Sequence, residues 1–268
     1  MARSKTLARL SQTRPFRLWT EAPAWAWVVI VMAVVALAVM TPFALRRETP
    51  RADQVARAIA AAEAAAAASE ASTAAAATRV DIAVLGDSFT SGSPMDSGPQ
   101  TQWPALLTSQ YPWDVTAYAA DGTGFVNQNG YPNTTFGWRV DRVMAATPDV
   151  VVVAGGHDDA DQSVAKVRTA AEDVVTRLRD GLPNAKLIVI GVLWPGPPPS
   201  NVTAINDALR EVATDAGTTF VDPLAEGWLN DPGELIGSDG THPTDAGHQA
   251  LARRIGDALI AAGVPTTV

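Results

Sequence analysis

Three short apolar runs constrain most strongly what this chain can fold into. They are VDIAVL at residues 80–85, DVVVVA at 149–154 and KLIVIGVL at 186–193. Runs this rich in valine and isoleucine are typical of strands that are buried on both faces of a parallel sheet. Weaker strand candidates lie at residues 114–119 and 218–221.

Segments with helical spacing of apolar residues separate these strands. They fall at residues 103–110, 136–146, 163–182, 202–216 and 244–262. In the last segment Thr244 is placed to cap the helix, with Asp245 in the first turn. This alternation predicts an α/β domain over residues 80–268, with a parallel sheet covered by helices on both faces. In such sheets the active site lies outside the carboxyl ends of the strands, so functional residues are expected there.

The amino-terminal third has a different composition. Residues 22–45 carry no charge over 24 positions, and a membrane-spanning helix needs about 20 apolar residues. We therefore expect a single transmembrane signal anchor at 22–45, after a basic cytoplasmic tail at 1–21. The length of the apolar stretch and the lack of a small-x-small cleavage site before Arg46 favour an uncleaved anchor over a cleaved signal peptide.

Residues 46–79 are dominated by alanine, whose high helix propensity predicts a helical stalk. The segment has no heptad repeat of large apolar residues, which argues against a coiled coil. Basic residues stand on both sides of the predicted span, so the positive-inside rule favours a cytoplasmic amino terminus only weakly. The domain at 80–268 is then expected at the cell membrane, on its extracytoplasmic side.

Charge and composition exclude several classes of function. Residues 1–45 carry a net charge of +4 and the rest of the chain −12, so nucleic acid is not an expected partner. The absence of cysteine excludes disulfides, thiolate metal sites and cysteine nucleophiles. The three histidines (His157, His242 and His248) are too scattered to indicate a metal site. No metal or organic cofactor is predicted.

Polar or glycine-rich loops follow the predicted strands and precede the last helix. They are GDS at residues 86–88, GTG at 122–124, GGHDD at 155–159 and DGTHP at 239–243. A serine hydroxyl is a weak nucleophile that needs an adjacent base, itself oriented by a third group. Asp239 and His242 are three residues apart, so the carboxylate can hold the imidazole while the other ring nitrogen faces Ser88.

Taken together, these motifs resemble the SGNH (GDSL-type) hydrolase family over about residues 80–262. Gly86-Asp87-Ser88-Phe89 is similar to the first block of that family, and Asp239-Gly240-Thr241-His242-Pro243 to its last block. The resemblance implies a three-layer α/β/α, flavodoxin-like fold. It also implies that Ser88 is the nucleophile and first oxyanion donor, and that Asp239 and His242 are the acid and base.

The middle blocks of the family match less closely. The backbone oxyanion donor of the family most closely maps to Gly124, with Gly122 as the alternative. The pattern GxND falls on residues 156–159, which puts Asp158 in place of a donor asparagine; another register pairs that asparagine with His157. An ionised carboxylate cannot donate a hydrogen bond. Three possibilities stay open: a protonated Asp158 donates, His157 replaces it, or catalysis is weak.

The sequence thus predicts a serine esterase that hydrolyses small-molecule, glycan or lipid esters through an acyl-enzyme outside the cytoplasm. Two alternatives stay open. One is an acyltransferase or deacetylase acting on cell-envelope glycans, and the other is a catalytically weak envelope-binding domain. Among the remaining residues, Asp87 is expected to be structural, His248 exposed or capping, and Trp138 and Trp228 part of the core.

Overall fold

The computed structural model describes residues 24–44, 52–77 and 79–267, and the chain divides into two units, residues 1–68 and 69–268. Two helices precede the sheet in the chain, α1 (Ala24–Ala44) and α2 (Ala52–Ala77). The sequence predicts helices in both of these segments. Across the described residues we find no helix that is long and apolar enough to cross a membrane. The predicted anchor at 22–45 includes positions outside the described residues, and it stays a prediction.

The second unit is built on one five-stranded parallel sheet with strand order β2-β1-β3-β4-β5. The strands are β1 (Val80–Gly86), β2 (Trp113–Ala119), β3 (Val150–Ala154), β4 (Lys186–Ile190) and β5 (Thr219–Val221). All five predicted strands are therefore confirmed, with changes at their ends. The order is that of flavodoxin-like sheets, in which ligands bind where the strand order reverses, here between β1 and β3.

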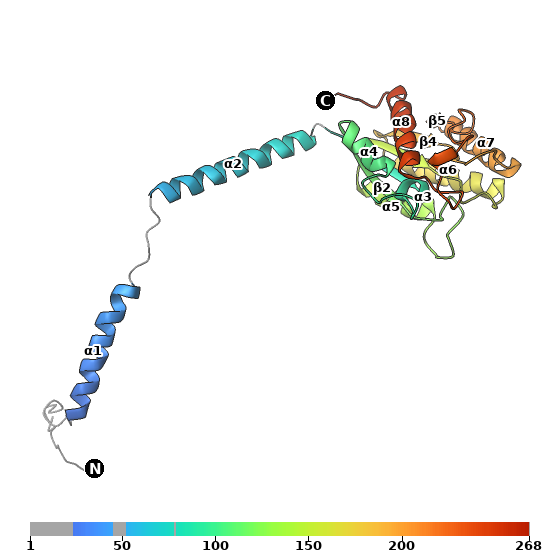
Figure 1. Ribbon diagram of the computed structural model, residues 1–268. Coiled ribbons are helices and arrows are strands. Elements are labelled where there is room, and N and C mark those ends of the chain that lie inside the picture. The colour runs from blue at the N-terminus through green and yellow to red at the C-terminus, as the bar shows by residue number, and fades with distance from the viewer. Residues whose placement is uncertain (1–23, 45–51, 78, 268) are drawn as a thin grey trace, which may run out of the picture. The chain divides into compact units, whose positions relative to one another are not determined.

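Helices cover both faces of this sheet, which gives the predicted three layers (Figure 1). One face carries α4 (Trp103–Gln110) and α8 (Asp245–Ala261), and the other carries α5 (Phe136–Ala145), α6 (Val164–Gly181) and α7 (Ser200–Asp215). Successive side chains of a strand point to opposite faces. Val152 accordingly packs in the α4/α8 layer, whereas Val151 and Val153 pack in the α5/α6/α7 layer.

Helix α8 is fixed at its start by polar contacts. Thr244 accepts a hydrogen bond from Gly247 N (3.2 Å), which confirms the predicted cap. The expectation that His248 is exposed or capping is wrong, because its side chain is fully buried. Its Nδ1 lies 3.4 Å from Trp103 N and its Nε2 lies 3.5 Å from Asp96 Oδ2. These contacts join α8 to the segment that follows the end of β1.

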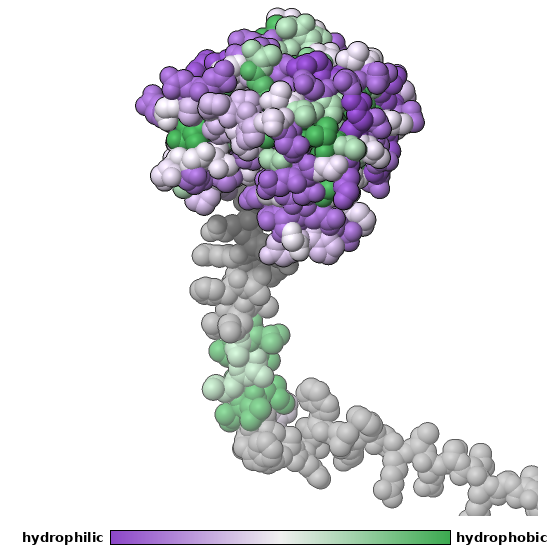
Figure 2. Space-filling model, turned by 90° about the vertical axis from the view of Figure 1, so that its right-hand side faces the viewer, coloured by the Kyte–Doolittle hydropathy of each residue, from purple (hydrophilic) through white to green (hydrophobic). Residues whose placement is uncertain are grey.

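The surface of the domain is mostly hydrophilic on the face shown in Figure 2, with small apolar patches. Trp228 is 3% exposed, as expected of a core residue. The same expectation is wrong for Trp138, which is 60% exposed. Trp138 lies on the solvent side of an amphipathic α5, whose buried residues are Phe136, Arg139, Val140 and Val143.

The loop between β2 and α5 is held by one carboxylate from the next loop along the sheet. Asp159 is completely buried, and its two oxygens accept hydrogen bonds from the backbone N–H groups of residues 125, 126 and 127 at 2.7–3.0 Å. Asn127 also donates from its side chain to Asp158 O (2.7 Å). Two loops at the carboxyl edge of the sheet are thereby fixed to each other.

We expect Asp159→Ala to lower the free energy of unfolding by about 2–4 kcal/mol, because buried N–H groups left without an acceptor cost about 1–3 kcal/mol each. Urea unfolding followed by tryptophan fluorescence measures this change. Asp161→Ala is the matched control, because Asp161 is exposed two positions away and is expected to change stability by no more than about 0.5 kcal/mol. Equal effects of the two substitutions would show that the carboxylate does not hold the loop.

Candidate active site

Ser88, His242 and Asp239 form a continuous hydrogen-bonded row at the carboxyl edge of the sheet. Ser88 begins α3 (Ser88–Ser91), directly after β1. Its Oγ lies 3.1 Å from His242 Nε2, and His242 Nδ1 lies 2.6 Å from Asp239 Oδ2. The acid and base come from the loop between the short 3-10 helix η1 (Gly233–Leu235) and α8. The structure thus brings together the three residues predicted as nucleophile, base and acid.

The orientation of Asp239 is set by its own loop. Its Oδ1 accepts hydrogen bonds from Thr241 N (2.9 Å) and His242 N (3.0 Å), which leaves Oδ2 for the imidazole. The bond from Thr241, together with the bond from the His242 side chain, lowers the pKa of Asp239 to about 2. Asp239 is therefore ionised above about pH 2, so its carboxylate can hold the Nδ1–H tautomer of His242.

The turn that carries Ser88 is closely packed. Asp87 is 2% exposed, and its carboxylate accepts a hydrogen bond from Phe89 N (2.9 Å) as the cap of α3. A Cβ atom at Gly86 would lie 2.2 Å from Thr90 Oγ1, so only glycine fits there. Burial, and then the nearby Asp158, raise the pKa of Asp87 well above its ordinary value. These contacts fit the structural role expected for Asp87.

Arg139 is a residue of the site that the sequence prediction missed. Its buried guanidinium donates to Gly86 O (2.7 Å), Tyr118 O (2.6 Å) and Thr123 Oγ1 (2.8 Å). Burial lowers the pKa of Arg139 to about 10, partly offset by Asp87, so it stays charged at neutral pH. The sequence did contain a signal for a buried role of Arg139. The buried positions of this amphipathic helix are spaced i, i+3, i+4 and i+7, and Arg139 occupies one of them.

The backbone N–H group that was predicted to donate to the oxyanion, that of Gly124, already has a hydrogen-bond acceptor within the protein. The Gly124 N–H donates to Asn127 O (3.0 Å) instead of being free for a substrate. Glycine is still required there, because a Cβ would lie 2.2 Å from the Asp159 carboxylate. The alternative, Gly122, has a φ of +67° and is packed against the side chain of Asn129. The N–H of Ser88 stands at the start of α3, where no intrahelical acceptor exists for it.

The two candidates for the third donor have different environments. Asp158 Oδ2 is buried and lacks a hydrogen-bond partner among the residues that the structure describes. Burial, and then the neighbouring Asp159, raise the pKa of Asp158 to about 6. A carboxyl group donates only when protonated, so the predicted donor role of Asp158 requires the protonated form, which prevails below about pH 6.

His157 does not present a donor in its neutral form. Its Nδ1 lies 3.0 Å from Leu193 O, and because a carbonyl only accepts, Nδ1 carries the proton. Burial lowers the pKa of His157, an effect partly opposed by the bond to Leu193, so the neutral ring is favoured at pH 7. Nε2 is then an acceptor, which does not fit the alternative in which His157 replaces the donor asparagine.

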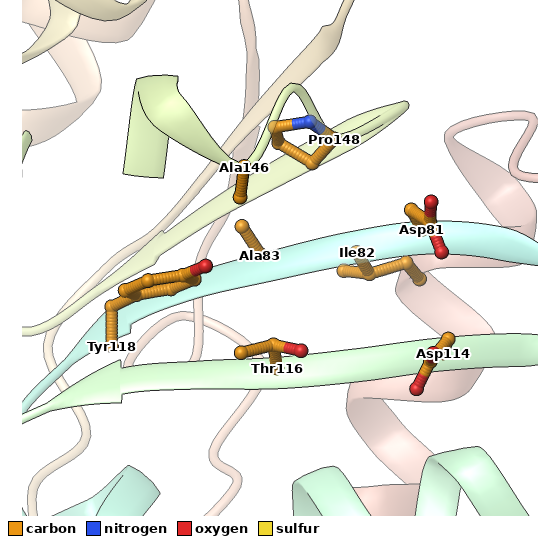
Figure 3. A pocket seen from close by; sticks show the side chains of 8 residues that line it. All are labelled: Asp81, Ile82, Ala83, Asp114, Thr116, Tyr118, Ala146 and Pro148. Atoms are coloured by element: carbon orange, nitrogen blue, oxygen red, sulfur yellow. The ribbon is translucent and has the colours of Figure 1, made fainter. Parts of the chain in front are cut away.

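A pocket elsewhere on the domain is not part of this site. It lies over β1 and β2 (Figure 3). Its volume is about 190 Å³. Its lining residues are Asp81, Ile82, Ala83, Asp114, Thr116, Tyr118, Ala146 and Pro148. None of the predicted site residues lines it. Within the described ranges, no group of three or more histidine or acidic side chains is arranged to hold a metal ion.

Fold and site together define a serine hydrolase built on a flavodoxin-like parallel sheet. The model of the GDSL-like Lipase/Acylhydrolase family matches residues 84–250, and the chain belongs to this family. A GDSL lipase of Mycobacterium tuberculosis is 33% identical over 182 residues, which cover 65% of this chain and 79% of that protein. The predicted enzyme class is therefore confirmed.

Solved structures with low sequence identity share the fold. TesA is 22% identical with a TM-score of 0.57, covering 68% of this chain and 99% of its own. A family two carbohydrate esterase from Clostridium thermocellum, in complex with cellohexaose, is 20% identical with a TM-score of 0.56. The match covers 69% of this chain and 64% of the esterase. Est24, a carbohydrate acetylesterase from Sinorhizobium meliloti, is 14% identical with a TM-score of 0.56. The match covers 68% of this chain and 99% of Est24.

We predict that Asp158→Asn raises kcat for a short acyl ester, and that the gain depends on pH. At pH 8 the wild-type carboxylate is ionised and repels the oxyanion, whereas asparagine donates; we expect a gain of about 10-fold or more. At pH 5 the carboxyl group is mostly protonated, since its pKa is about 6, and the two proteins are expected to differ little.

The measurement is kcat of both proteins from pH 5 to pH 8, with Asp161→Asn as a control at an exposed position. A ratio of the two kcat values that does not change with pH would contradict this role of Asp158.

Proposed function

We propose that this protein is a serine esterase that hydrolyses carboxylic ester bonds through an acyl-enzyme, outside the cytoplasm. The observation that carries the proposal is the row Ser88–His242–Asp239, with separations of 3.1 Å and 2.6 Å. Nucleophile, base and orienting carboxylate in hydrogen-bond reach are the arrangement that serine acyl transfer requires. Membership of an acylhydrolase family supports it.

In the first half of the reaction, His242 Nε2 takes the proton of Ser88 Oγ, and the oxygen forms a bond to the ester carbonyl carbon. The oxyanion is stabilised by the Ser88 N–H and, when protonated, by Asp158. The ester C–O bond then breaks, and the leaving alcohol receives the proton from His242. Asp239 stabilises the imidazolium that exists between these two transfers.

In the second half, His242 takes a proton from water, whose oxygen attacks the acyl carbon on Ser88. Breakdown of this second tetrahedral intermediate returns the proton to Ser88 Oγ and releases the carboxylic acid. Every proton and bond is accounted for by the ester, one water molecule and the row of three residues.

We propose esters of glycans or other polyols as the substrate class, alongside small-molecule esters. The support is that two proteins of the same fold act on carbohydrate esters according to their descriptions, one of them in complex with cellohexaose. The domain is acidic, so a neutral ester fits its charge better than an anionic one.

We expect Ser88→Ala to lower kcat for p-nitrophenyl acetate by at least about 10⁴-fold, because removal of the nucleophile disables the whole row. A chain-length series of p-nitrophenyl esters on the full chain measures the activity and the preferred acyl group. Ser109→Ala, at an exposed position of α4, is the matched control and is expected to keep wild-type activity.

Covalent labelling by a serine-directed organophosphonate tests the same proposal without turnover. Wild type and Ser109→Ala should be labelled, and Ser88→Ala should not. No labelling of wild type, or equal labelling of Ser88→Ala, would contradict the esterase and favour a non-catalytic envelope-binding domain.

We further propose that residues 22–45 anchor the chain in the cell membrane and that residues 46–79 separate the domain from it. The support is the uncharged 24-residue stretch of the sequence. Full-length protein should then stay in the membrane pellet after an alkaline carbonate wash, and a variant lacking residues 1–45 should be released. Release of the full-length protein by the wash would rule the anchor out.

A further inference from the structure

His157 occupies the edge of the candidate active site between two aromatic side chains. Its ring centroid lies 5.0 Å from that of Phe89, the residue after the nucleophile, and 4.6 Å from that of Trp194. The Phe89 ring also lies 6.4 Å from the ring of His242. His157 therefore stands beside the reacting groups, although the mechanism above gives it no task.

The free nitrogen of His157 is a hydrogen-bond acceptor. Because Nδ1–H donates to Leu193 O (3.0 Å), Nε2 of the neutral ring carries only a lone pair. Nε2 has no hydrogen-bond partner in the described part of the chain, and it is not fully buried. It is therefore accessible to solvent and to a bound molecule.

The loop that carries Trp194 is rigid and tied to the His157 loop. Trp194 is followed by Pro-Gly-Pro-Pro-Pro at residues 195–199, and proline fixes the backbone φ angle. Gly196 N donates to Leu229 O (2.8 Å). Asn201, in the first turn of α7 directly after this run, donates from its side chain to the backbone carbonyls of Ala160 (2.6 Å) and Gln162 (3.1 Å), in the segment just after His157. The acceptor nitrogen and the indole ring are thus held in one fixed arrangement.

The charge around this arrangement limits what it can bind. Three carboxyl groups, those of Asp87, Asp158 and Asp159, lie on the two neighbouring loops and interact electrostatically with one another. Arg139 lies near Asp87, and its two terminal nitrogens donate to three backbone and side-chain oxygens, whereas its Nε is buried without a partner among the described residues. An anionic group is disfavoured here, whereas a neutral molecule with a hydroxyl donor matches the acceptor nitrogen.

We propose that His157 Nε2 and the Trp194 ring form a subsite for the alcohol part of the ester, one that selects an alcohol with a second, free hydroxyl near the ester bond. Partially acylated sugars and polyols have this chemistry. The hydroxyl donates to Nε2, and the carbon frame of the alcohol packs against the part of the half-buried Trp194 side chain that solvent reaches. This inference rests on the proposed esterase function and narrows its substrate class.

The discrimination has a simple physical origin. An ester whose alcohol lacks the hydroxyl leaves Nε2 desolvated without a donor, and unpaired polar groups are the strongest basis for rejecting a substrate analogue. The pair 2-hydroxyethyl acetate and n-propyl acetate isolates this effect, because one hydroxyl group replaces one methyl group of similar size.

We expect the full-length wild-type protein to have a kcat/KM at least about 10-fold higher for 2-hydroxyethyl acetate than for n-propyl acetate. In His157→Phe, which keeps a ring between Phe89 and Trp194 but has no acceptor, the ratio should fall to about one. Trp138→Phe changes an aromatic residue that is 60% exposed on α5 and serves as the control; its ratio should equal that of wild type.

A wild-type ratio near one overturns the subsite without any variant, and a high ratio is assigned to His157 by its loss in His157→Phe. Equal kcat/KM values for the two acetates, or a ratio that His157→Phe leaves unchanged, would overturn the subsite. Turnover of p-nitrophenyl acetate without turnover of either acetate would also overturn it. A protein that turns over no ester and takes no organophosphonate label contradicts the esterase itself, which separates the two failures.

Discussion

The buried guanidinium of Arg139 is the contact on which the carboxyl edge of the sheet depends. It joins the last residue of β1 to β2 through Gly86 and Tyr118, and it reaches Thr123 in the loop that follows β2. The turn that presents Ser88 starts at Gly86, so the position of the nucleophile is set by the same cation. A helix on one face of the sheet thereby determines geometry at its edge.

Three carboxyl groups lie near this one cation. The hydrogen bonds that each carboxyl group accepts determine its role in the structure. Asp159 is satisfied by three backbone N–H groups and serves the loop. Asp87 has one such bond, and Asp158 Oδ2 has none among the described residues. The pKa values of both are raised by burial first, and then by the neighbouring acids. Burial thus favours the protonated form of both carboxyl groups.

Much of the fold could be predicted because its signals are local. The runs around Val152 and Ile188 are apolar at successive positions, as full burial on two faces requires. Ser88, Asp239 and His242 could also be predicted, since each lies in a short motif at a strand or helix end. The motif could not show that the Gly124 N–H turns back to Asn127, because the hydrogen-bond partners of a loop are set by its tertiary fold.

The same limit explains His248 and His157, whose surroundings come from distant segments. His248 is buried by Asp96 and Trp103, about 150 positions earlier, and nothing in its own helix indicates them. His157 is oriented by a carbonyl 36 positions later, which leaves its other ring nitrogen as an acceptor, whereas one sequence alternative made His157 a donor. Consecutive residues of one loop thus differ in their contacts: His157 packs between Phe89 and Trp194, Asp158 Oδ2 is buried without a partner among the described residues, and Asp159 holds the backbone. The chemistry of this loop depends on which side-chain atoms remain without a hydrogen bond to the rest of the protein. Residue type alone does not determine those atoms.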